Sequence, residues 1–137
     1  MADSENLNVL LVEDNFGDVL YIHKLLEYSS AKIEHNFEIK TCVCLEEALE
    51  VISLEDIRIV LLDLNLPDSK GLETFKRLHR VYPHLPVIIL TGINDEHLSF
   101  EAVNEGASDY LVKGEIDDEF LMVSLVEALQ TNTIGYD

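Results

Sequence analysis

Three acidic side chains follow two short apolar segments of this sequence. Glu13 and Asp14 come directly after Asn8 to Val12, and Asp63 follows the apolar run Ile59 to Leu62. Carboxylate oxygens are hard ligands that suit Mg²⁺, and carboxylates close together repel unless a cation lies among them. We therefore expect a magnesium site if the fold brings these three acids together. Taken singly, Asp63 could cap a turn, and the other two could be acids favoured at the N-terminus of a helix.

Two hydrogen-bond donors end two later apolar segments. Thr91 ends V-I-I-L-T, and Lys113, the only Lys or Arg after Arg80, ends D-Y-L-V-K. An ammonium group and a hydroxyl that face a carboxylate can donate hydrogen bonds to a larger anion formed on it. Aspartate is a known covalent acceptor of phosphoryl groups, and positioning and charge neutralisation catalyse that transfer. The pattern favours phosphoryl transfer to Asp63, helped by Mg²⁺ and Lys113, although Thr91 alone could simply end a strand.

The elements that must position these side chains alternate along the chain. Apolar or alternating segments predict strands, and segments of helical periodicity follow each of them. Five repeats of strand and helix predict an α/β fold, a doubly wound five-stranded parallel sheet of flavodoxin-like type with strand order 2-1-3-4-5. The strands are expected at 8–12, 37–44, 57–63, 86–91 and 109–113, and the helices at about 16–28, 45–53, 72–82, 95–105 and 117–130.

This strand order predicts where the polar side chains meet. The first and third strands are neighbours at the switch point, where a crevice opens at the carboxyl ends of the strands. Glu13, Asp14 and Asp63 should converge there, with Thr91 and Lys113 on the other side of Asp63. The second strand offers no polar group at its end, as expected for an edge strand outside the crevice.

Composition narrows the possibilities further. The chain of 137 residues fits one domain, 1–137, with a core at about 8–130. Neither an apolar run of membrane-spanning length nor a signal peptide is found, so we expect a cytoplasmic protein without membrane insertion. The net charge of −18 disfavours direct contact with nucleic acid and favours a cation or a basic protein surface as partner. Cys42 and Cys44 are expected to be reduced packing residues.

Four motifs, taken together, resemble the response-regulator receiver domain of two-component phosphorelays. They are L-V-E-D-N, L-L-D-L-N-L-P-D-S-K-G-L, I-L-T-G and D-Y-L-V-K, and the resemblance runs from about Val9 to Leu129. It implies that Asp63 takes a phosphoryl group from the phosphohistidine of a histidine kinase or a histidine phosphotransfer protein. It also implies a regulatory domain, not an enzyme, that catalyses only its own phosphorylation and dephosphorylation and signals to a downstream protein.

The resemblance also assigns roles to single residues. It implies that Asp14 and Asp63 ligate Mg²⁺ directly, together with the backbone carbonyl of Asn65, and that Glu13 holds the metal through water. Thr91 and Lys113 would bind the phosphoryl oxygens. Tyr110 matches the switch aromatic of the family, whose rotamer follows the shift of the threonine.

Two other classes of protein stay open at this point. Aspartate-based phosphatases and mutases also use a strand-end aspartate with Mg²⁺, but they require D-x-D, and the second position here is Asn65. They usually also carry a cap domain, for which the chain has no room. The second of these two classes is a phosphate-independent scaffold of the same fold.

The sequence departs from the family at Gly114, which follows Lys113 where a proline is usual. A non-proline cis peptide costs about 3–4 kcal/mol, so we expect a trans bond and a loop rebuilt by the wide φ range of glycine. The C-terminal segment is too short for the output domain that many relatives carry, which is expected of a stand-alone regulator or of a chain that stops at a domain boundary.

The region of the last two predicted helices is strongly acidic. Many receivers dimerise through this region with bases on one copy against acids on the other, but here Lys113 is the sole base. We therefore expect no salt-bridged homodimer through this face, which would suit a more basic partner. The acids are Asp95, Glu96, Glu101, Glu105, Asp109, Glu115, Asp117, Asp118 and Glu119.

Overall fold

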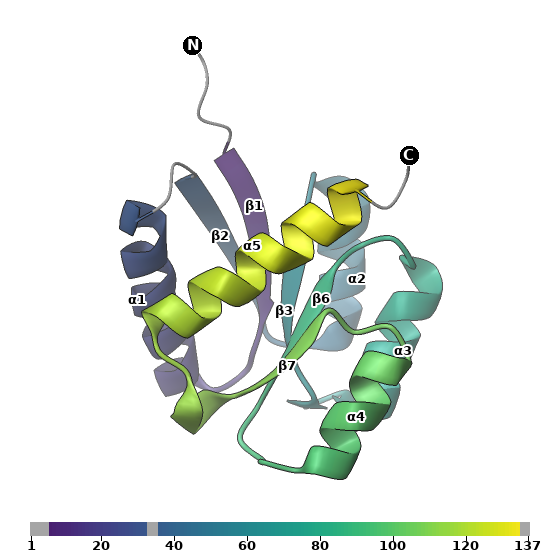
Figure 1. Ribbon diagram of the computed structural model, residues 1–137. Helices are drawn as coiled ribbons and strands as arrows, with labels where there is room; N and C mark the ends of the chain where they lie inside the picture. The colour runs from purple at the N-terminus through teal and green to yellow at the C-terminus, as the bar shows by residue number, and fades with distance from the viewer. Residues whose placement is uncertain (1–5, 33–35, 135–137) are drawn as a thin grey trace.

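A parallel sheet of five strands forms the centre of the molecule (Figure 1). The computed structural model describes residues 6–32 and 36–134. The strand order in the sheet is β2-β1-β3-β6-β7, and every neighbouring pair in it is parallel. Leaving out two very short strands that form a separate hairpin, this is the order 2-1-3-4-5, so the predicted doubly wound α/β fold is confirmed.

The bounds of the elements follow the hydrophobic pattern with small shifts. The strands of the sheet are β1 (Asn6–Val12), β2 (Asn36–Cys42), β3 (Ile59–Asp63), β6 (Val87–Thr91) and β7 (Asp109–Val112). The helices are α1 (Phe16–Lys32), α2 (Leu45–Leu54), α3 (Leu72–Val81), α4 (Glu96–Asn104) and α5 (Asp118–Ile134), with a short 3-10 turn η1 (Lys113–Glu115) before α5.

Several predicted bounds were wrong by a few residues. The outer helices α1 and α5 both continue beyond the expected ends, because polar residues can extend a helix without adding to its apolar stripe. The strand β2 stops at Cys42, and Lys113 lies in η1 and not in the last strand. Cys42 is buried, Cys44 is partly exposed, and both are free.

Each face of the sheet is covered by its own set of helices. On one face, Leu10, Val60 and Ile89 pack with residues of α2, α3 and α4, such as Phe75. On the other face, Leu11, Leu61 and Ile88 pack with residues of α1 and α5, and Figure 1 shows α5 crossing the sheet on that side. Residues 9–12 of β1, 59–62 of β3 and 87–90 of β6 are all apolar and point alternately to opposite faces, as expected for strands buried on both sides.

A two-stranded hairpin after β3 was not predicted. The strands β4 (Asn65–Leu66) and β5 (Ser69–Lys70) pair antiparallel around Pro67 and Asp68. Strands of two residues leave no periodicity in a sequence. Gly71 then adopts φ 73°, a left-handed conformation that favours glycine, directly before α3 begins.

The turn of this hairpin also caps a distant helix. Both carboxylate oxygens of Asp68 accept hydrogen bonds from the first N–H groups of α2, Oδ1 from Leu45 and Oδ2 from Glu46, each at 2.9 Å. The residue that precedes α2, Cys44, makes no side-chain cap of its own. The loop that follows β3 is therefore tied to the start of α2.

No helix within residues 6–32 and 36–134 is both long enough and apolar enough to cross a membrane.

Candidate functional site

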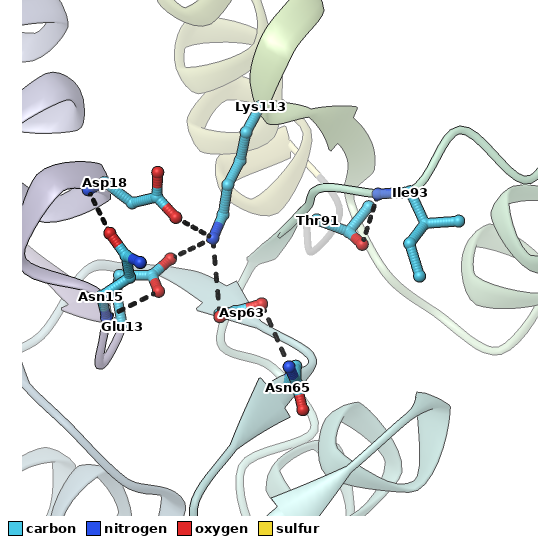
Figure 2. Close-up of polar contacts among 8 residues, drawn as sticks. All are labelled: Glu13, Asn15, Asp18, Asp63, Asn65, Thr91, Ile93 and Lys113. Carbon is cyan, nitrogen blue, oxygen red and sulfur yellow. Dashed lines mark hydrogen bonds and ion pairs between the residues drawn. The ribbon is translucent and has the colours of Figure 1, made fainter.

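Asp63 is the last residue of β3, the middle strand of the sheet, and its side chain is largely buried. One carboxylate oxygen, Oδ1, accepts a hydrogen bond of 3.2 Å from the N–H of Asn65. The other, Oδ2, faces Lys113 (Figure 2). A carboxylate held from both sides on a rigid strand has a fixed orientation toward the crevice.

Glu13, Asp14 and Asp63 come together as the sequence predicts. One carboxylate oxygen from each lies within 4.8 Å of the other two. The main chain at Glu13 is fixed by its N–H, which donates to the carbonyl of Cys42 at 2.9 Å, and its Oε2 accepts a hydrogen bond from the N–H of Asn15 at 3.1 Å. The three acids therefore lie at the carboxyl ends of two adjacent strands, β1 and β3, whose register is set by the sheet itself.

Burial makes this cluster electrostatically unusual. Glu13 is 1% exposed, and burial raises the pKa of its carboxyl group to about 7, with a further rise from the charge of Asp63, against the lowering effect of Lys113 and of the Asn15 N–H. Asp14, in contrast, is exposed. Buried acids beside an exposed one, all with oxygen donors, fit a hydrated Mg²⁺ ion, which binds few carboxylates and keeps several waters.

Lys113 supplies the positive charge of the site. Its Nζ lies 2.5 Å from Oε1 of Glu13, 2.9 Å from Oδ2 of Asp18 and 3.5 Å from Oδ2 of Asp63 (Figure 2). Among the described residues that line this cleft, no other side chain is cationic. Burial lowers the pKa of the ammonium group, but the hydrogen bonds to Glu13 and Asp18 outweigh that effect and the pKa is raised. Lys113 is thus a protonated donor.

Asp18 is a residue of the site that the sequence did not reveal. It lies in the first turn of α1, where acidic residues are common because they interact favourably with the helix dipole. Its own N–H donates to Oδ1 of Asn15, which caps the helix at 2.9 Å. The only signal in the sequence is its position one turn beyond Asp14, on the helix that opens at the crevice.

Thr91 and Tyr110 meet on one residue of the loop after β6. The hydroxyl oxygen of Thr91 accepts a hydrogen bond from the N–H of Ile93 at 3.2 Å, and the hydroxyl of Tyr110 donates to the carbonyl of Ile93 at 3.0 Å. Burial raises the pKa of Tyr110, so its hydroxyl is a donor at neutral pH. The ring of Tyr110 packs inward with the core on the side of α4.

The peptide bond between Lys113 and Gly114 is trans. The prediction that glycine would rebuild the loop through its wide φ range was wrong, because Gly114 does not adopt a positive φ. The chain instead turns as η1, a conformation open to any residue, and Lys113 still reaches Asp63 from its start.

The residues that the sequence analysis assigned to the site line one crevice at the carboxyl ends of β1, β3 and β6. Tyr110 is the exception, and it contacts the edge of this crevice through the carbonyl of Ile93. Asn65 contributes its backbone beside Asp63, while its side chain is exposed. The cleft is lined by Glu13, Asp14, Asn15, Asp18, Asp63, Asn65, Thr91, Gly92, Ile93 and Lys113.

The chain belongs to the response regulator receiver domain family, whose model it matches over residues 9–129. Receiver domains are regulatory signalling domains of two-component systems, and they generally bind Mg²⁺ at an acidic pocket. The solved receiver domain protein of Clostridium thermocellum superposes with a TM-score of 0.78 at 25% identity, over 93% of this chain and 98% of that one. A CheY-like receiver from Methanospirillum hungatei gives 0.75 at 25% identity, over 94% and 98%.

Curated relatives include larger proteins. The cell cycle response regulator CtrA of Brucella ovis is 30% identical over 130 residues, which cover 95% of this chain and 53% of that protein. The cell cycle transcriptional regulator CtrA of Caulobacter vibrioides is 28% identical over the same shares. The chain thus spans about half the length of the curated relatives it matches.

Proposed function

We propose that Asp63 accepts a phosphoryl group from the phosphohistidine of a histidine kinase or a histidine phosphotransfer protein, in a reaction that needs Mg²⁺. The phosphorylated chain then presents an altered surface to a downstream protein. The chain catalyses only its own phosphorylation and dephosphorylation and acts on no other substrate.

The observation that carries this proposal is the setting of Asp63. Its carboxylate lies at the open end of the sheet, close to two more acids and 3.5 Å from the ammonium group of Lys113, which also contacts one of those acids, Glu13. Such a carboxylate is an oriented nucleophile in a place where negative charge can be neutralised. Phosphoryl transfer depends on these two factors more than on covalent chemistry.

The proposed step replaces one bond to phosphorus by another. A carboxylate oxygen of Asp63 attacks, a P–O bond forms, and the P–N bond of the donor breaks as the leaving imidazole nitrogen takes up a proton. Mg²⁺ held by Asp14, Asp63 and the Asn65 carbonyl, with Glu13 through water, would neutralise the phosphoryl oxygens. Lys113 and the hydroxyl of Thr91 would donate hydrogen bonds to the same oxygens.

The contacts on Ile93 suggest how the surface responds. If the hydroxyl of Thr91 turns to a phosphoryl oxygen, it gives up the N–H of Ile93. The loop after β6 is then held less firmly, and the partner of the Tyr110 hydroxyl shifts with it. The change reaches the exposed start of α4, where a protein partner can detect it.

Incubation with Mg²⁺ and a small phosphodonor such as acetyl phosphate, followed by mass spectrometry, tests the proposal. A receiver gains one phosphoryl group in a hydroxylamine-labile acyl phosphate. An aspartate-based phosphatase would turn over added phosphate esters, and a phosphate-independent scaffold would neither gain mass nor bind beryllium fluoride. Either of these last two results would contradict the proposal.

A further inference from the structure

Lys113 is shared among three carboxylates, and the closest two are not Asp63. We propose that Asp18 is a positioning residue that holds the ammonium group of Lys113 toward α1 and so weakens the grip of Lys113 on a phosphoryl group at Asp63. This inference rests on the function proposed above, since it concerns the same acceptor.

The distances show how the donors of Lys113 are used. Nζ lies 2.9 Å from Asp18, within the range of charge-assisted hydrogen bonds, and 2.5 Å from Glu13, a closer ion pair, but 3.5 Å from Asp63. Lys113 donates a hydrogen bond to Asp18 and forms an ion pair with Glu13, and both contacts are shorter than its distance to Asp63. A phosphoryl group at Asp63 must therefore compete with these two carboxylates for the ammonium group.

Glu13 and Asp18 differ in how easily they can release Lys113. Glu13 is buried and would lose its counterion while shielded from water, which carries a large free-energy cost. The side chain of Asp18 is 38% exposed, so water can solvate its carboxylate when Lys113 moves. When Asp63 is modified, Lys113 therefore breaks its contact with Asp18 and not the one with Glu13. The strength of the contact with Asp18 then determines how tightly Lys113 binds the phosphoryl group.

A simpler explanation is that Asp18 only stabilises the first turn of α1 through the helix dipole. That role depends on the charge of Asp18 and on the helix, not on Lys113. The two explanations therefore differ in whether the effect of replacing Asp18 needs Lys113 to be present.

The test is the affinity for beryllium fluoride at saturating Mg²⁺, followed by NMR. Asp18→Asn keeps the shape but removes the charge that holds Lys113, so it should tighten binding about two- to fivefold, the range of partly exposed ion pairs. The matched control is Glu27→Gln, a loss of the same charge at an exposed position of the same helix, and it should leave the affinity unchanged. The affinity for Mg²⁺ alone should not rise with Asp18→Asn, because removal of a nearby acid cannot attract a cation.

The outcomes separate this inference from the proposed function. If the unaltered protein binds no beryllium fluoride, both are wrong. If it binds and Asp18→Asn matches Glu27→Gln, only the inference is wrong. A gain for Asp18→Asn of equal size in a Lys113→Gln background would also overturn it.

A second measurement needs no phosphoryl analogue. Thermal unfolding in EDTA of the unaltered chain, Asp18→Asn, Lys113→Gln and the double variant forms a double-mutant cycle. Asp18→Asn should lower the melting temperature more when Lys113 is present than when it is replaced, because the ion pair between Asp18 and Lys113 is lost only in the first case. Equal shifts in both backgrounds would show that Asp18 acts through the helix alone.

Discussion

The ammonium nitrogen of Lys113 lies 3.5 Å from Oδ2 of Asp63, although the two residues follow strands that are not neighbours in the sheet. Lys113 comes directly after the edge strand β7, Asp63 ends the middle strand β3, and β6 lies between them. The contact spans the carboxyl end of β6, where Thr91 is placed. The three side chains thus enclose the position that a phosphoryl group on Asp63 would take.

Replacing Asp63 by Asn should stabilise the protein in the absence of metal. The change removes one member of a group of carboxylates that repel each other, and Lys113 keeps Glu13 and Asp18 as partners. With an effective dielectric constant near 20, we expect the free energy of unfolding to rise by about 1 kcal/mol. Denaturant unfolding in EDTA measures this, and a loss of stability would mean that attraction to Lys113 dominates at Asp63.

Mg²⁺ should raise the melting temperature, because it binds the folded acid cluster and not the unfolded chain. At ten times its dissociation constant the expected stabilisation is about 1.4 kcal/mol. Asp14→Ala should remove most of this gain, while Glu101→Ala, at an exposed acid of α4, should keep it. Equal melting temperatures of the unaltered protein in EDTA and in millimolar Mg²⁺ would show that the converging carboxylates are not a metal site.

Asp68→Ala should lower the free energy of unfolding by about 1 kcal/mol, the usual effect of removing a helix cap. Burial alone would raise the pKa of Asp68, but the N–H groups of Leu45 and Glu46 outweigh it and hold the pKa below 3.8. Because the folded pKa is the lower one, the stabilisation is present above pH 3.8 and is lost as the pH falls through the folded value. Unfolding of both proteins from pH 6 to pH 3 checks this: the difference should shrink only at the acid end.

The fold and the convergence of the site were predictable because both follow from periodicity. The apolar runs of β1, β3 and β6 differ clearly from the helical stripes between them, and parallel strands bring their carboxyl ends to one edge. Placing Glu13 and Asp14 beside Asp63 then required only the strand order.

The contacts of Asp18 and Asp68 could not be predicted in this way. Each joins residues far apart in the chain through one side-chain rotamer, Asp18 with Lys113 and Asp68 with the start of α2. Both acids also have an adequate local explanation, the first as a residue of a helix N-terminus and the second as a turn residue. A residue whose type is already explained by its local structure gives no indication in the sequence that it also contacts a distant residue.

The face made by α4, β7 and α5 should not form a salt-bridged homodimer on phosphorylation. Asp95, Glu96, Glu101, Glu115 and Glu119 are all exposed there, and the one base of this region, Lys113, is engaged in the site. Contact between two copies would set acids against acids. Light scattering at low salt with Mg²⁺ and beryllium fluoride, followed by crosslinking from α5, measures this, and an analogue-dependent dimer crosslinked through α5 would contradict it.

The central claim is that Asp63 is the phosphoryl acceptor, and mapping the modified residue after reaction with acetyl phosphate and Mg²⁺ tests it most directly. We expect one phosphoryl group, located on Asp63 by mass spectrometry of peptides after borohydride reduction of the acyl phosphate. Asp63→Asn should stay folded and gain no mass under the same conditions. A phosphoryl group on another residue, or an Asp63→Asn protein that is still phosphorylated to the same extent, would contradict the assignment.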